Sequence, residues 1–341
     1  MTKVQSRIWT PIDFEKDGKQ SDCLRLPQST TKSAYGWIPI PIVSIKNGSG
    51  PTALLIAGNH GDEYEGQLAL MNIARGLRRE DVSGRVIIIP SLNFPAVQAG
   101  IRVSPLDGGN LNRSFPGRAL GTPTEMIAHY ISDVMLPMAD VAVDLHSGGF
   151  SLDYVQCALI RPGRTKEETD ALIKLVHVFG APVSFIGNGD GGGGATTLNA
   201  VARELGVPCI TTELGGGATL SKAGLRIAED GVKRLLKHFG IAPAIEVPDS
   251  PGSELMEIPG RDFYLYADGD GIFEPSAAVG DHVEEGQFAG RLHSFDNPIK
   301  APQELRFPRS GQVSCRRYPS LTTRGDCLYN LMRPLQPAED E

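Results

Sequence analysis

Six short stretches of the chain are apolar almost throughout and rich in β-branched residues; they cover residues 37–45, 52–57, 85–90, 140–145, 155–160 and 207–212. A strand that faces solvent on one side alternates polar and apolar side chains, whereas a strand covered on both faces carries a continuous apolar run. Sheets with helices packed on both faces provide such cover. The sequence therefore predicts an α/β fold with a mixed, mostly parallel central sheet and helices on both of its faces.

Helical patterns fill the gaps between these stretches. Residues 65–77 place apolar side chains at helical spacing, and residues 222–238 form the last such segment before Gly240. Glycine can end a helix because it tolerates the left-handed conformation that follows many helices. Thr122 and Glu125 flank Pro123 in the arrangement of a helix N-cap with a capping box. We expect helices to begin or end at these signals.

The composition of the chain changes after the last predicted helix. Residues 241–259 combine Pro, Gly and Ser, and closely spaced turn signals follow them. We therefore expect two domains: an α/β domain over residues 1–245, including a β extension at 1–50, and a small all-β domain over residues 246–341. The run GDHVEEGQFAG in the second domain resembles a turn of the barrel-sandwich domains that carry biotin or lipoyl groups. The lysine that such domains modify is absent, so no carrier role is expected.

An excess of acidic over basic residues, 40 against 33, gives the chain a net charge of −7. This balance argues against nucleic acid or an anionic membrane as a partner. No apolar stretch approaches the roughly 18 residues that a membrane span needs, and the first residues lack the apolar core of a secretory signal. We expect a cytoplasmic protein. Its five cysteines are dispersed and form no C-x-x-C pair, which indicates reduced thiols, so a bound metal would use histidine and carboxylate ligands.

Polar residues with metal-binding potential follow two of the predicted strands. His60 and Glu63 lie three positions apart in the turn after residues 52–57, and His146 follows residues 140–145. The carboxyl ends of the strands are where open α/β sheets build their sites. Two histidines and one glutamate that leave a fourth position open form a catalytic zinc arrangement, since structural sites close all four positions. We expect one Zn²⁺ per chain, although such a ligand set also suits Fe, Co or Mn.

Three further candidates accompany the metal ligands. Glu213 follows the strand at 207–212 and precedes three glycines, which suits a general base beside a metal. The long segment after residues 85–90 contains Arg102 and, within the run GGNLNRSFPG, Arg113. A guanidinium can clamp a carboxylate through two hydrogen bonds or stabilise a developing oxyanion. Hydrolysis is therefore the leading reaction class.

The order of these motifs resembles the succinylglutamate desuccinylase/aspartoacylase family, relatives of the zinc carboxypeptidases. The shared elements are G-x-H-G-x-E, then N-R, then D-x-H and a late glutamate, over roughly residues 40–240, and the β tail is also similar. The resemblance implies a role for seven residues: zinc binding by His60, Glu63 and His146, acid/base catalysis by Glu213, polarisation of the scissile carbonyl by Arg102, and binding of the substrate carboxylate by Asn112 and Arg113.

The resemblance also implies a substrate. The wording AGNHGDEYEG, SPLDGGNLNRSFPG, DLHSGG and TTELGGG is similar to that of family members that deacetylate N-α-acetyl-L-2,4-diaminobutyrate in ectoine degradation. We therefore expect a zinc-dependent amidohydrolase that cleaves this small-molecule N-acyl amino acid to L-2,4-diaminobutyrate and acetate. Asp107 and Asp190 are candidates to receive the side-chain amine, although either can be a turn residue. The glycine-rich loop at 189–194 is either a lid or a flexible connection.

Other functions are consistent with the same residues. The chain can be a desuccinylase or aspartoacylase that acts on another N-acyl amino acid, or a zinc carboxypeptidase that acts on small peptides. A non-catalytic zinc-binding protein is disfavoured because a pure binder has no need of the base Glu213. Whether the chain forms a homo-oligomer is also left open.

Overall fold

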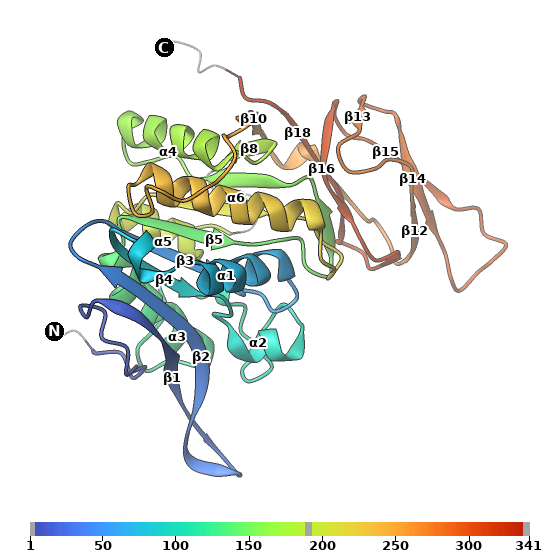
Figure 1. Cartoon of the computed structure of the whole chain (residues 1–341). Helices are drawn as coiled ribbons and strands as arrows, with labels where there is room; N and C mark the ends of the chain where they lie inside the picture. The colour runs from blue at the N-terminus through green and yellow to red at the C-terminus, as the bar shows by residue number, and fades with distance from the viewer. Residues whose placement is uncertain (1–3, 188–192, 337–341) are drawn as a thin grey trace.

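The computed structural model describes residues 4–187 and 193–336, and its largest feature is a mixed β-sheet (Figure 1). The parallel heart of the sheet has the strand order β4-β3-β5-β9, formed by β3 (Thr52–Ala57), β4 (Gly84–Ile89), β5 (Val141–Leu145) and β9 (Cys209–Glu213). On one side β2 (Ser33–Asn47) and β1 (Gly18–Thr30) extend it in antiparallel fashion. On the other side β7 (Cys157–Ile160) is antiparallel to β9, and β8 (Val183–Ile186) is parallel to β7. The expected mixed, mostly parallel sheet is confirmed.

Helices cover both faces of this sheet (Figure 1). One face carries α1 (Tyr64–Gly76), α4 (Lys166–Phe179) and α6 (Lys222–His238), and the other carries α3 (Pro123–Tyr130) and α5 (Leu198–Leu205). The neighbouring residues Leu54 and Leu55 of β3 are each 1% exposed and belong to the two different cores. Successive side chains of a strand point to opposite faces. Burial on both sides is therefore the physical reason for the continuous apolar runs.

The predicted helix signals are present. The Thr122 side chain accepts a hydrogen bond from the backbone of Glu125, whose carboxylate accepts one from the backbone of Thr122 in return. The α6 helix has the predicted bounds. The helix that begins at Pro123 stops being α-helical earlier than the apolar pattern suggests, and continues as a π turn at Ile131–Met135 and a 3-10 turn at Leu136–Met138. Pro137 in the second turn has no N–H to donate to an α-helical bond.

The C-terminal region is all-β and has its own core. A four-stranded antiparallel sheet has the order β15-β14-β12-β17, from β12 (Gly271–Pro275), β14 (Phe288–His293), β15 (Gln303–Arg306) and β17 (Leu321–Thr322). Further strands are β10 (Glu254–Glu257), β11 (Tyr264–Tyr266), β13 (His282–Val283), β16 (Gly311–Arg317) and β18 (Cys327–Pro334). The rings of Phe273 and Phe307 contact Tyr329, with centroid separations of 5.6 and 5.0 Å. These aromatic side chains fill the space between the small sheet and β18.

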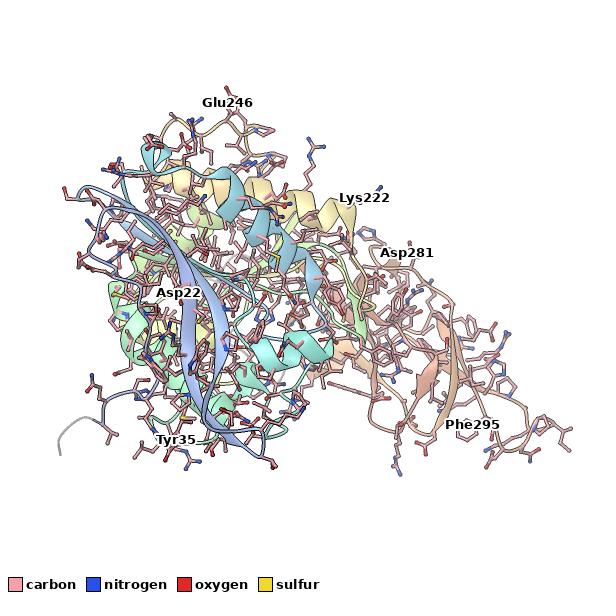
Figure 2. All side chains as sticks on the ribbon, turned by 60° about the horizontal axis from the view of Figure 1, so that its bottom comes forward. Asp22, Tyr35, Lys222, Glu246, Asp281 and Phe295 are labelled. Carbon is pink, nitrogen blue, oxygen red and sulfur yellow. The ribbon has the colours of Figure 1, made fainter. Side chains whose placement is uncertain are left out.

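Two sets of strand pairs join this region to the α/β part. Strand β10 pairs with β8 and with β18, and β6 (Leu152–Tyr154) pairs with β16. The domain boundary expected at residue 245 stays a prediction. Exposed Tyr35 of the β1–β2 ribbon and exposed Phe295 of the loop after β14 lie toward opposite ends of the molecule (Figure 2). The helices of the described ranges are all too short or too polar to cross a membrane.

Candidate active site

The turn after β3 is shaped by glycine. Gly58 has a φ of 70°, a value that favours glycine. A Cβ atom on Gly61 would lie 1.9 Å from the carbonyl oxygen of Ala96, so only glycine fits this close approach. His60 lies between these two glycines, and Glu63 follows Gly61 as the N-cap residue of α1. The glycines of the motif therefore set the turn that brings both side chains to the carboxyl end of β3.

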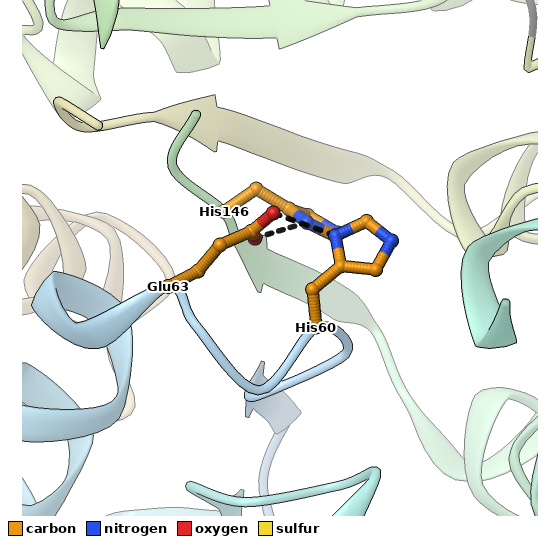
Figure 3. A group of neighbouring side chains, drawn as sticks. All are labelled: His60, Glu63 and His146. Atoms are coloured by element: carbon orange, nitrogen blue, oxygen red, sulfur yellow. Dashed lines mark hydrogen bonds and ion pairs between the residues drawn. The ribbon is translucent and has the colours of Figure 1, made fainter. Parts of the chain in front are cut away.

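His60, Glu63 and His146 form one buried cluster (Figure 3). The Nδ1 atom of His60 lies 2.6 Å from Oε1 of Glu63, and the Nδ1 atom of His146 lies 2.8 Å from Oε2 of the same carboxylate. One ligand atom from each of the three residues lies within 4.8 Å of the others. Parallel pairing of β3 with β5 brings His146 to Glu63 across 83 positions of sequence. The three predicted metal ligands are thus together.

Each imidazole is also held on its other nitrogen. The Nε2 atom of His146 lies 3.0 Å from Oδ2 of Asp144, and the Nε2 atom of His60 lies 3.0 Å from Oδ1 of Asn110. Metal-binding histidines commonly hydrogen-bond a carboxylate or carbonyl oxygen in this way, which fixes the ring orientation. Asp144 belongs to the D-x-H element and Asn110 to the run GGNLNRSFPG, but the sequence analysis assigns a role to neither. The spacing of Asp144 and His146 was the available signal, because residues two apart on a strand share a face.

The donor set of the cluster fits zinc. Burial alone would raise the pKa of Glu63, but the two facing imidazoles lower it well below its usual value. Burial alone would lower the pKa of His146, yet the carboxylates of Asp144 and Glu63 raise it well above its usual value. A carboxylate as deeply buried as that of Glu63 is stable only with positive charge or hydrogen-bond donors beside it. Zinc takes histidine nitrogen and carboxylate oxygen as ligands, so a divalent cation can supply that charge.

Of the two predicted arginines, Arg102 contacts the cluster and Arg113 lies further along the same loop. The Nη1 atom of Arg102 is 3.3 Å from Nδ1 of His60 and 3.6 Å from Oε1 of Glu63. Arg113 follows in the short turn Leu111–Arg113, where its side chain donates to the carbonyl oxygen of Asn112 at 2.7 Å. Desolvation and then the Arg102 charge lower the pKa of Arg113, whereas Glu213 raises it. Two guanidinium groups therefore face the same region from one loop.

The side chain of Asn112 already makes two contacts within the protein. Its Oδ1 atom accepts a hydrogen bond from the backbone of Leu198 at 3.2 Å, and its Nδ2 atom lies 3.3 Å from Nε2 of His146. The side chain thereby connects the first turn of α5 to the cluster. The predicted contact between Asn112 and a substrate carboxylate stays a prediction.

Glu213 ends β9 and faces the cluster. Its Oε2 atom is buried and has no hydrogen-bond partner among the described residues. Burial and the neighbouring charge of Glu63 raise the pKa of Glu213 well above its usual value, although His146 and Arg102 lower it in part. An oxygen without a hydrogen-bond partner among the described residues, on a carboxyl group with a raised pKa, is suited to accept a proton from water.

Tyr154 is a further neighbour that the sequence analysis did not single out. It lies at the end of β6, and its backbone donates to the carbonyl oxygen of Gly215 in the segment after Glu213. Burial and then nearby ionisable groups, Glu213 included, raise the pKa of Tyr154 well above its usual value. No motif surrounds Tyr154, and its position beside the segment after Glu213 depends on the backbone bridge between Asp153 and Gly216.

The two aspartates considered for the substrate amine differ in outcome. Asp107 accepts hydrogen bonds from the backbone and hydroxyl of Thr124, at 2.8 and 2.7 Å, and from the backbone of Gly109. These bonds hold the loop against α3, as a turn residue does, and a contact of Asp107 with the substrate amine stays a prediction. Asp190 and most of the loop at 189–194 lie outside the described residues. A cavity of about 340 Å³ between α1, α6 and residues 244–246 contains none of the predicted site residues.

The fold and the site together define a class. A mixed α/β sheet presents two histidines, a glutamate and the separate carboxylate of Glu213 at the carboxyl ends of neighbouring strands, next to a guanidinium. This is the arrangement of metal-dependent hydrolases related to zinc carboxypeptidases.

The chain belongs to the succinylglutamate desuccinylase/aspartoacylase family, whose catalytic-domain model matches residues 49–239. It is 42% identical, over 95% of its length and 94% of the relative, to N-alpha-acetyl-L-2,4-diaminobutyric acid deacetylase of Halomonas elongata. The product-bound structure of the ectoine utilization protein EutE (DoeB) from Ruegeria pomeroyi superposes with a TM-score of 0.92 at 40% identity, covering 97% of this chain and all of that one. A succinylglutamate desuccinylase/aspartoacylase structure from Rhodobacter sphaeroides gives 0.90 at 38% identity, with coverage of 97% and 100%. The family expected from the motifs is confirmed, and with it a hydrolytic deacylase.

Proposed function

We propose that the chain is a zinc-dependent deacetylase that hydrolyses N-α-acetyl-L-2,4-diaminobutyrate to L-2,4-diaminobutyrate and acetate. The observation that carries the proposal is the buried His60, Glu63 and His146 cluster beside Glu213, whose Oε2 atom has no hydrogen-bond partner in the part of the chain that the structure describes. The substrate follows from the 42% identity to the Halomonas elongata deacetylase over almost the whole chain. A cytoplasmic location and a homo-oligomeric state stay predictions.

In this proposal, each site residue has a separate role in amide hydrolysis. His60, Glu63 and His146 hold the zinc ion, which when bound supplies Lewis-acid polarisation of the acyl carbonyl and eases deprotonation of water. Glu213 accepts the proton of the attacking water and returns it to the nitrogen of the leaving amine. Arg102, within 3.6 Å of the Glu63 carboxylate, stabilises the negative charge that develops on the carbonyl oxygen.

Arg113 would bind the α-carboxylate of the substrate. We expect Arg113→Ala to lower kcat/KM about 10- to 150-fold on N-α-acetyl-L-2,4-diaminobutyrate, the range for losing a hydrogen bond to a charged group. The same substitution should have little effect when the substrate carboxylate is blocked as an amide. Arg118→Ala is the matched control, because Arg118 lies in the same loop but pairs with Glu125. Equal losses on the free and blocked substrates would contradict a carboxylate clamp.

The substrate itself is tested by acetate release, before and after chelation and zinc add-back. Release from N-α-acetyl-L-2,4-diaminobutyrate should stop on chelation and return with zinc, while N-succinyl-glutamate and N-acetyl-aspartate stay intact. Cleavage of one of these other compounds would keep the reaction and overturn the substrate. Inactivity on all three would contradict the proposed reaction and favour peptides or a binding role.

A further inference from the structure

A second glutamate of the D-E-Y-E-G motif lies in the first turn of α1 but does not belong to the metal cluster. Glu65 is 0% exposed. Its Oε1 atom accepts a hydrogen bond from the backbone N–H of Ser221 at 2.8 Å, across 156 positions of sequence. A Cβ atom on Gly215 would lie only 3.0 Å from the same oxygen, so the glycine leaves room for the carboxylate. Glu65 thus connects α1 to the segment that follows Glu213.

That segment is short and fixed at both of its ends. Ser221 caps α6, since its hydroxyl accepts from the backbone of Gly224 at 3.0 Å. At the other end, the backbone of Leu214 donates to the carbonyl oxygen of His146 at 3.1 Å. Glu65 therefore attaches the far end of the segment to α1, the helix that begins directly after Glu63.

We propose that Glu65 is a positioning residue for Glu213: its carboxylate oxygen holds the segment from Leu214 to Ser221 against α1, so that the base stays aligned with the metal cluster. The inference rests on the proposed function of Glu213. Displacement of a catalytic group by about 1 Å can lower a rate on the order of 100-fold, so a fixed segment is a functional requirement. Position 65 therefore requires a side chain that is as long as glutamate and ends in an acceptor oxygen.

Two substitutions of Glu65 separate the effect of side-chain length from the effect of charge. Glu65→Gln keeps the length and the acceptor oxygen and loses the charge, whereas Glu65→Asp keeps the charge and withdraws the oxygen from Ser221. We expect Glu65→Asp to lower kcat at least about tenfold with KM and zinc content close to wild type, and Glu65→Gln to stay within about threefold of wild type. Glu229→Ala is the matched control, because Glu229 also connects α6 to α1, through Asn72 at 2.5 Å, away from the cluster.

Hydrogen exchange tests the same inference without turnover. The peptide over residues 214–221 should exchange faster in Glu65→Asp than in wild type, and at the wild-type rate in Glu65→Gln and Glu229→Ala. An aspartate variant with full kcat and protection would overturn the proposal, as would a glutamine variant that loses as much as the aspartate variant. Loss of zinc from Glu65→Asp, or an equal loss of kcat in Glu229→Ala, would also overturn it. If wild-type protein releases no acetate, the proposed function fails, while the exchange result still decides the contact.

Discussion

Replacement of Glu213 by glutamine should lower kcat for acetate release at least about 100-fold, the usual scale for loss of general acid/base catalysis. Glutamine matches the shape of glutamate but cannot accept the proton of water or pass it to the leaving amine. The Oε2 atom of Glu213 has no partner among the described residues, so the change breaks no hydrogen bond there. Bound zinc, measured by elemental analysis, and the melting temperature should stay close to wild type.

The control for this variant is another glutamate outside the cluster. Glu229 contacts Asn72 between α6 and α1, and Glu229→Gln should retain wild-type kcat. Full activity of Glu213→Gln would exclude Glu213 as the base. A loss of activity that comes with a loss of zinc would show instead that Glu213 helps to hold the metal.

Removal of one cluster histidine should have the second large effect. We expect His60→Ala to lower zinc affinity at least about 100-fold, because even groups that only support a metal ligand are worth about 10- to 100-fold. Acetate release should fall with the bound zinc. Chelated wild-type protein should recover on zinc add-back at concentrations that leave His60→Ala inactive, and competition with a chromogenic chelator measures the affinity.

A second histidine and glutamate pair provides the control for the metal ligand. The Nε2 atom of His293 lies 2.7 Å from Oε2 of Glu274, a separation close to that between His60 and Glu63. The described part of the chain offers no metal cluster that includes His293. His293→Ala should therefore retain zinc and activity. Unchanged zinc affinity in His60→Ala would contradict the assignment of the cluster.

Local sequence patterns predicted much of the fold and of the site. The two faces of β3 are both buried, which its unbroken apolar run indicates, and the capping box at Thr122 and Glu125 forms as its spacing predicts. His60, Glu63 and His146 could be grouped from their motifs alone, because parallel strands place their carboxyl ends at one edge of the sheet. Each of these signals depends on residues close together in sequence.

Other features depended on partners that the sequence does not specify. Asn110 was part of a recognised run, yet nothing in that run indicated that its amide oxygen would meet His60. The sequence also gives no sign that Asp107 bonds to the backbone and hydroxyl of Thr124 and so holds its loop against α3. Tyr154 reaches the neighbourhood of Glu213 through the bridge between Asp153 and Gly216 and its own backbone bond to Gly215, about 60 positions further along the chain.

The sequence by itself determined the class of fold, the family and the residue types that gather at the carboxyl ends of the strands, because periodicity, capping and motif spacing are local properties of the chain. Only the tertiary structure decided the strand order β4-β3-β5-β9 and the contacts that hold the site, such as that between Glu65 and Ser221. Those contacts join residues far apart in sequence, and they form only when both faces of the sheet are packed. Their geometry is therefore a property of the packed chain as a whole.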